Sequence, residues 1–137
     1  MKLRDYSFCD EVRFERSNKI SVMGLYGDVI NLQPKSPESL TLPIPIRLAT
    51  LMRFDFEPSD DRPDSFRFIL KMNGSAIAEL SGDMEVKPSR SQGNIAINGE
   101  GFPIELGDIG FLVSLYKKGV ELYSKEIKSA IRVVLNE

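Results

Sequence analysis

The feature that most constrains this chain is an alternation of polar and apolar residues that recurs along most of its length. From Glu11 to Glu15, Val12 and Phe14 occupy alternate positions, and charged residues occupy the positions between them. Alternation with a period of two is typical of a β-strand that buries one face. A chain built mainly from such segments is expected to form sheets that pack face to face.

Three turn signals join neighbouring strand segments into predicted hairpins. Residues Ser17 to Lys19 separate the first strand from the segment KISVMGLYG, and Asn73-Gly74 separates SFRFILKM from SAIAELSG. Lys117 to Gly119 divides the last long alternating stretch in the same way. Asparagine and glycine favour such turns because they tolerate positive φ angles.

The remaining segments predict loops and further strands. Four of the eight prolines lie within Asn31–Pro45, which predicts a crossover loop between sheets with a single helical turn starting at Pro37. Ile46–Glu57 resumes the strand pattern unevenly, which indicates a bulge or burial on both faces. Polar loops are expected at Pro58–Asp64 and Val86–Asn94, and the short strand IAING follows.

Together these segments predict an all-β fold, a two-sheet antiparallel β-sandwich of about eight strands with little helix. The connectivity is expected to be immunoglobulin-like or C2-like. The tail IRVVLNE fits either the far end of the last strand or a short additional edge strand. The charges of Lys117–Asn136 also fit helical spacing, so a C-terminal helix is the alternative for that region. At 137 residues the chain is predicted to be a single domain, 1–137.

The composition limits where the protein acts and what it binds. The formal net charge is -2, so nucleic-acid binding is not expected. The N-terminal stretch MKLRDYSFCDEV lacks the apolar core of a signal peptide, and no run of roughly 20 apolar residues is present to span a membrane. A single cysteine cannot form an intramolecular disulfide. A cytoplasmic location is therefore expected.

The absent residue types exclude several kinds of chemistry. The chain contains no histidine, which removes the commonest general base and the Ser-His and Cys-His nucleophilic pairs. One cysteine without histidine cannot supply the usual ligands of zinc. No glycine-rich phosphate-binding pattern is present either. We therefore expect no enzymatic activity, no catalytic residues and no cofactor.

The segment FCDEVRFERSNKISVMGLYGDVI resembles a family of small bacterial proteins of unknown function. Members of that family open with a Cys-Asp-x-Val-Arg strand, a lysine-containing turn and a Ser-x-x-Gly-x-Tyr strand. The matching positions are Cys9, Asp10, Val12, Arg13, Lys19, Ser21, Gly24 and Tyr26. The C-terminal segment PIELGDIGFLVSLYKKGVELYSKEI is similar to the family's final hairpin, though more weakly. The resemblance implies one compact β domain from a bacterium or a mobile element and carries no activity.

The only cysteine, Cys9, could be a reactive thiol or a structural residue. A reactive thiolate needs a nearby cation or a helix N-terminus to lower its pKa, whereas Asp10 and Glu11 next to Cys9 are acidic. Strict alternation places Cys9 on the face opposite Val12 and Phe14. We expect a structural cysteine.

An acidic loop is the candidate for metal binding. Calcium binds six to eight oxygen ligands, and flexible loops at the rim of a sandwich can supply them. The spacing matches no EF-hand loop, and Arg62 lies within the cluster, so calcium is a weak hypothesis. The candidate ligands are Asp55, Glu57, Asp60, Asp61 and Asp64.

Basic residues in loops and in the last hairpin form a third candidate set. Lysines on exposed strands commonly discourage aggregation between sheet edges, which is the simpler explanation for them. Nucleic-acid or lipid-headgroup binding would require them to gather on one surface. The set comprises Lys87, Arg90, Lys117, Lys118, Lys125, Lys128 and Arg132.

The sequence therefore favours a non-enzymatic β-sandwich that binds another protein, an accessory factor of a bacterium or mobile element. Self-association through an exposed strand edge is a second form of the same hypothesis. The alternative is a small-ligand or calcium-dependent binding domain that uses the acidic rim loop.

Overall fold

The computed structural model describes residues 1–34, 36, 38 and 40–135. Within these residues the chain forms nine strands and one short 3₁₀ turn, η1 (Arg16–Asn18). The strands are β1 (Lys2–Phe14), β2 (Ile20–Leu25), β3 (Val29–Leu32), β4 (Ile44–Asp55), β5 (Ser65–Met72), β6 (Ser75–Asp83), β7 (Gln92–Ile104), β8 (Gly107–Lys117) and β9 (Val120–Leu135).

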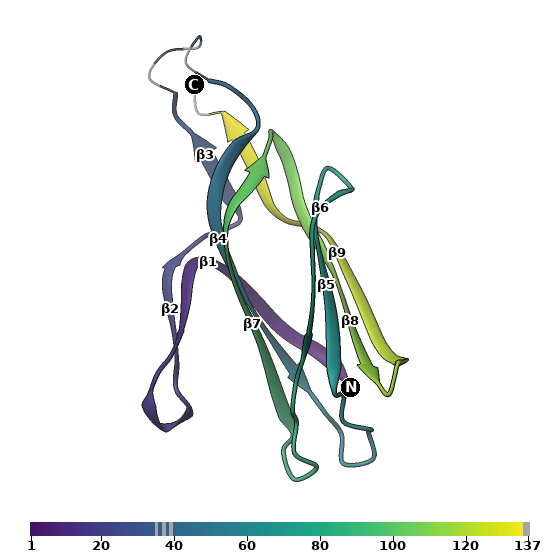
Figure 1. Ribbon diagram of the computed structural model, residues 1–137. Helices are drawn as coiled ribbons and strands as arrows, with labels where there is room; N and C mark the ends of the chain where they lie inside the picture. The colour runs from purple at the N-terminus through teal and green to yellow at the C-terminus, as the bar shows by residue number, and fades with distance from the viewer. Residues whose placement is uncertain (35, 37, 39, 136–137) are drawn as a thin grey trace.

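The strands form two sheets that pack against each other (Figure 1). The first sheet has the order β2-β1-β4-β7, and the second has the order β3-β9-β8-β5-β6. The predicted all-β sandwich with little helix is thus confirmed at this level. The described residues include no helix of the length and apolarity that crossing a membrane requires.

Two parts of the fold prediction are corrected by the structure. There are nine strands in the described residues rather than about eight, because Val29–Leu32 forms the short strand β3. The sandwich is also not wholly antiparallel, since β3 pairs with β9 in parallel, with Val29 opposite Arg132. The chain reaches β3 by crossing from the first sheet, so no tight hairpin turn imposes antiparallel pairing there.

All three predicted hairpins are present. The turn between β1 and β2 contains Asn18 with a φ of 59°, and the β5–β6 turn contains Asn73 and Gly74 with φ of 50° and 83°. Lys118 and Gly119 form the β8–β9 turn, also with positive φ. The helical alternative for the C-terminal region is wrong, because β9 is one strand that extends to Leu135.

The proline-rich segment connects the two sheets, as predicted, because β3 belongs to the second sheet and β4 to the first. Pro37, the expected start of a helical turn, lies outside the described residues. The predicted irregularity in β4 is a register shift between Ile46 and Leu48. β7 is longer than the predicted strand IAING and begins at Gln92, inside the expected loop.

A second irregularity, in β1, sets which of its side chains face the core. The register between β1 and β4 shifts between Leu3 and Asp5, so the alternation of the strand changes at that point. As a result Leu3, Tyr6 and Phe8 all pack against the core between the sheets. This change cannot be read from alternation in the sequence alone.

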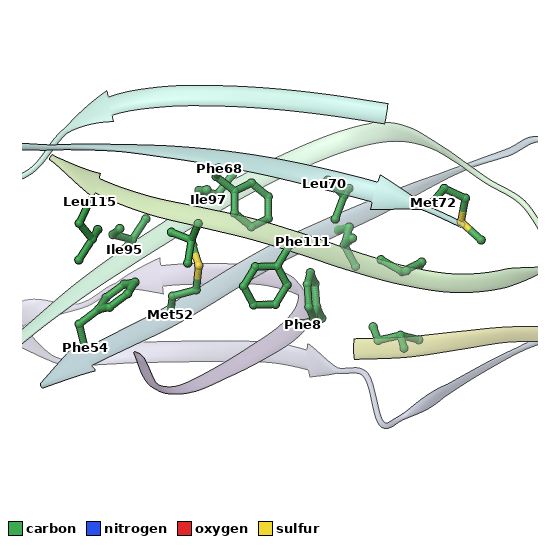
Figure 2. Close-up of a cluster of buried hydrophobic side chains, with 14 of the residues drawn as sticks. Phe8, Met52, Phe54, Phe68, Leu70, Met72, Ile95, Ile97, Phe111 and Leu115 are labelled. Carbon is green, nitrogen blue, oxygen red and sulfur yellow. The ribbon is translucent and has the colours of Figure 1, made fainter. Parts of the chain in front are cut away.

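The core between the sheets is centred on aromatic side chains (Figure 2). Phe111 of β8 is fully buried, and its ring lies 5.1 Å from Tyr6, 5.8 Å from Phe8 and 5.7 Å from Phe68, measured between centroids. The sheets are also joined by a hydrogen bond at one open side, where the Leu3 amide donates to the Tyr123 hydroxyl at 3.0 Å. The two sheets therefore form a rigid base for the elements at their edges.

Candidate interaction surface at the first hairpin

The β1–β2 hairpin leaves the main body of the first sheet, and an asparagine side chain helps to hold it there. Pairing between β1 and β4 ends where Cys9 lies opposite Ala49. Beyond that point β4 no longer pairs with β1, and the side chain of Asn98 on β7 bonds to the β1 backbone instead. Its Oδ1 accepts a hydrogen bond from the Val12 amide at 2.9 Å, and its Nδ2 donates to the Val12 carbonyl at 3.1 Å.

A small apolar cluster lies under this hairpin, on the outer face of the first sheet. It consists of Cys9 and Val12 of β1 with Ala49 and Leu51 of β4, and all four are buried. Ile20 of β2 packs against the same cluster. The hairpin is therefore anchored by apolar contacts as well as by Asn98.

Cys9 is fully buried in this cluster, as the structural interpretation requires. Its thiol donates a hydrogen bond to the Glu11 carbonyl at 3.4 Å. Burial raises the pKa of the Cys9 thiol, and the charge of Asp10 adds to the increase. Both effects disfavour the nucleophilic thiolate. Cys9 and Val12 are three positions apart, so strict alternation would place them on opposite faces of the strand. The structure instead places both side chains in one cluster.

The base of the hairpin is closed by a contact between Tyr26 and Asp10. The Tyr26 hydroxyl lies 3.0 Å from the Asp10 Oδ1 and 3.2 Å from the Arg47 carbonyl oxygen. Desolvation and the Asp10 carboxylate raise the pKa of Tyr26 to about 12. Gly24, with a φ of 66°, leaves space for Asp10, because a Cβ there would lie 2.2 Å from the carboxylate. Asp10, Gly24 and Tyr26, three positions of the motif that carries the family resemblance, thus contact one another at the base of the hairpin.

A polar hollow of about 330 Å³ lies beside this base. Arg47 forms an ion pair with Glu100 across it. Apart from Arg47, the charged side chains of the hollow are acidic, so this end of the hairpin is negative. The lining residues are Asp10, Glu11, Arg47, Asn98, Gly99 and Glu100.

The outer strand of the hairpin, β2, is an exposed edge of the first sheet. Its sequence ISVMGL contains no charged residue and no proline. Val22, Met23 and Leu25 are 37%, 44% and 67% exposed, and Phe14 of the paired strand is 70% exposed. Apolar side chains thus surround an open strand edge, which is a common site of strand addition.

The other sheet edges carry features that discourage pairing with another chain. β7 contains Pro103 and pairs with β4 through a register shift. β6 carries Glu79, which forms an ion pair with Arg67 at 2.6 Å. β3 has only four residues. Prolines, charges, bulges and short length are the usual protections of an edge, and residues Ile20 to Met23 of β2 carry no proline, no charge and no shift of register.

Four of the five candidate calcium ligands have separate partners elsewhere in the chain. Asp55 lies 3.8 Å from Arg4, and Asp61 lies 3.5 Å from Lys117. The Asp64 carboxylate accepts a hydrogen bond from a backbone amide in the β8–β9 turn. Among the described residues, including Glu57, no three histidine, cysteine or acidic side chains come together in a way that could hold a metal ion.

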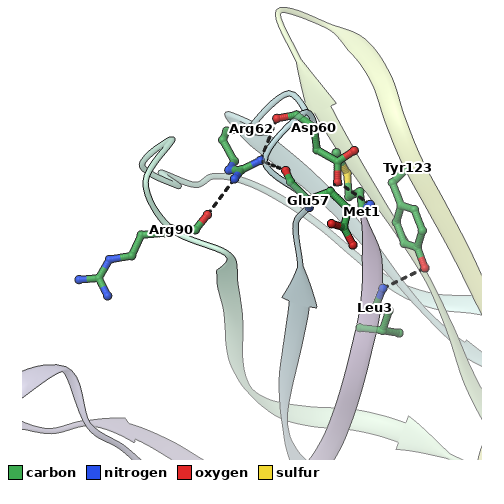
Figure 3. Close-up of polar contacts among 7 residues, drawn as sticks. All are labelled: Met1, Leu3, Glu57, Asp60, Arg62, Arg90 and Tyr123. Atoms are coloured by element: carbon green, nitrogen blue, oxygen red, sulfur yellow. Dashed lines mark hydrogen bonds and ion pairs between the residues drawn. The ribbon is translucent and has the colours of Figure 1, made fainter.

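Asp60 and Arg62 brace the acidic loop instead (Figure 3). The Asp60 carboxylate lies 2.6 Å from the Met1 ammonium group, which lowers the pKa of Asp60. The Arg62 guanidinium donates to carbonyl oxygens of its own loop and of the β6–β7 loop, including that of Arg90 at 2.9 Å. The acidic loop is therefore tied to its neighbours by hydrogen bonds.

The candidate basic residues are divided between two regions. Lys87 and Arg90 lie in the β6–β7 loop, and the others lie on the β8–β9 hairpin. Two of the latter are in ion pairs, Lys117 with Asp61 and Arg132 with Asp108, each at 3.5 Å. Lys118, Lys125 and Lys128 complete the set on that hairpin.

Sequence reasoning missed the residues that position the hairpin. Asn98 and Arg47 carry no local signal, because each acts on a segment far away in the chain. The spacing between Asn98 and Val12 is 86 residues. The motif matches at Asp10, Gly24 and Tyr26 drew attention to this region of the sequence. They did not predict that the three residues contact one another.

Comparison with models of known protein families finds no match, and comparison with curated protein sequences finds none either. The resemblance to a family of small bacterial proteins therefore stays a prediction. The function has to be argued from the geometry of the molecule.

Replacing Asn98 with alanine should loosen the hairpin without unfolding the sandwich. The Val12 amide and carbonyl would lose both partners, at a cost of about 1 to 2 kcal/mol in the free energy of unfolding. Chemical denaturation measures the loss. Asn94→Ala, at an exposed position on the same strand, is the matched control and should change stability by less than about 0.5 kcal/mol. Equal losses in both variants would contradict the role of Asn98.

Tyr26 should make stability depend on pH in the alkaline range. Its folded pKa of about 12 exceeds the ordinary tyrosine value of about 10. The folded state therefore favours the neutral phenol, and this stabilisation, complete below pH ~10, is lost as pH rises to ~12. Titration at 295 nm should show a step near pH 12 that Tyr26→Phe removes. Tyr116→Phe should keep the step, and its loss there would contradict the assignment.

Proposed function

We propose that this protein is a non-enzymatic, cytoplasmic interaction module that binds another polypeptide by strand addition at β2. The observation that carries the proposal is the uncharged, exposed edge formed by Ile20 to Met23. The absence of histidine supports the non-enzymatic part. The family resemblance supports an origin in a bacterium or a mobile element.

The backbone of β2 supports this mode of binding. Both backbone groups of Val12 are bonded to Asn98, which lies on the side away from β2. In antiparallel strands the amide and carbonyl of one residue point the same way, so Val12 and its partner Val22 form a non-hydrogen-bonded pair. The amide and carbonyl of Val22 then point outward along the edge, where an added strand would bond to them.

The side chains of the hairpin supply the apolar part of such a surface. Val22 and Met23 project from opposite faces of β2, since successive strand residues alternate. Leu25 follows Gly24, whose φ of 66° interrupts this alternation. Methionine adapts its shape to different partners, which suits a recognition surface. The hairpin itself is fixed by Asn98 and by the buried cluster around Cys9, so little ordering is needed before binding.

Val22→Lys should abolish binding while leaving the fold intact. A lysine on an edge strand disfavours strand addition, and the Val22 side chain is partly exposed, so a charge there is tolerated. The tagged protein would be used for affinity capture from lysate of its source cells, with quantitative mass spectrometry. Leu80→Lys is the matched control, because Leu80 is an exposed apolar residue on β6, the edge of the other sheet.

A protein captured in stoichiometric amounts by the wild type and by Leu80→Lys, but not by Val22→Lys, is the expected result. A partner that binds all three forms equally would show that binding does not use β2. Thermal unfolding of each variant would confirm that the sandwich is intact.

A further inference from the structure

We infer that the polypeptide that binds β2 is a second copy of this chain, paired antiparallel across a two-fold axis at Val22. This inference rests on the proposed function of the β2 edge. The two four-stranded first sheets would then join into one continuous sheet. The argument comes from the register of the edge and from the distribution of charge along the hairpin.

The register follows from the backbone groups that β2 leaves open. The amide and carbonyl of Val22 point outward, so Val22 can bond to its own copy across the axis. Ser21 then lies opposite Met23 of the partner copy, and Ile20 lies opposite Gly24. No like charges face each other in this pairing, because β2 contains none.

The two ends of the hairpin carry opposite charge. Arg13 is paired with Glu11 at 3.2 Å, and Arg47 is paired with Glu100. Of the remaining charges, the tip carries Arg16 and Lys19 against Glu15, and the base carries Asp10 and Asp28. Antiparallel pairing places the tip of each copy beside the base of the other, so the charges are complementary. Parallel pairing would place like charges together.

Two exposed residues, one at each end of the hairpin, allow a test of this complementarity. Arg16 lies in the turn at the tip, and Asp28 lies just beyond the end of β2 at the base. Both side chains are exposed, and among the described residues neither forms an ion pair within the chain. The two-fold axis brings the tip of one copy near the base of the other at both ends of the interface.

Sedimentation equilibrium of the full chain over a range of concentrations tests the inference. The wild type should show a monomer–dimer equilibrium. Arg16→Glu and Asp28→Arg should each raise the dissociation constant about tenfold, because each reverses a charge at one end of the hairpin in both copies. The double variant should recover part of that loss, because tip and base then both change sign at one position.

A cross-linking measurement checks the register independently. Val22→Cys should form a disulfide-linked dimer on mild oxidation, since the two side chains lie opposite each other at the axis. Leu80→Cys is the matched control, and it should give no dimer beyond the background of the wild type. Cys9 is buried and contributes little to that background.

The outcomes separate this inference from the proposed function. A double variant that remains as weak as the single ones, or cross-linking no greater than in Leu80→Cys, would overturn the self-pairing. If the wild type is monomeric at every concentration and capture of another protein still depends on Val22, the self-pairing is wrong and the proposed function stands. If the chain is monomeric and no capture depends on Val22, both are wrong.

Discussion

The paired hydrogen bonds from Asn98 to the backbone of Val12 are the contact on which the candidate surface depends. They let β1 separate from β4 after Cys9 without leaving the backbone groups of Val12 unpaired. They also decide which side of each hairpin strand faces outward. Because Val12 turns its polar groups toward Asn98, Val22 turns its own toward solvent. A side chain on β7 thus helps to hold the hairpin in place and is bonded on the side opposite the open edge of β2.

The hairpin combines a rigid base with an unprotected edge. Its base is closed by Tyr26 and Asp10 and supported by the buried Cys9 and Val12. Elsewhere the same chain protects its edges with a proline, an ion pair or short length. The contrast within one molecule is informative, because an exposed apolar edge without these protections is a liability unless it is covered by a partner. The acidic loop around Asp60, by comparison, is a structural brace.

The parts of the fold that were predictable from sequence are those fixed by neighbouring residues. The turns at Asn73-Gly74 and Lys118-Gly119 follow from local backbone preference, and the strands beside them follow from alternation. β3 was missed because its four residues pair with β9, about a hundred residues later. Asn98 was missed for the same reason. The burial of Cys9 agrees with a structural role, whereas its place in the same cluster as Val12 could not be read from alternation.

Amide hydrogen exchange at Val22, measured by NMR, tests the central claim most directly. The outward orientation predicts that the Val22 amide exchanges rapidly in dilute solution, while the Ser21 and Met23 amides, which face β1, are protected. Self-pairing at high concentration should then slow exchange at Val22 alone among the three. A Val22 amide that is protected in dilute solution, with Met23 exchanging fast, would mean that β2 presents the opposite backbone groups and that the account of this edge is wrong.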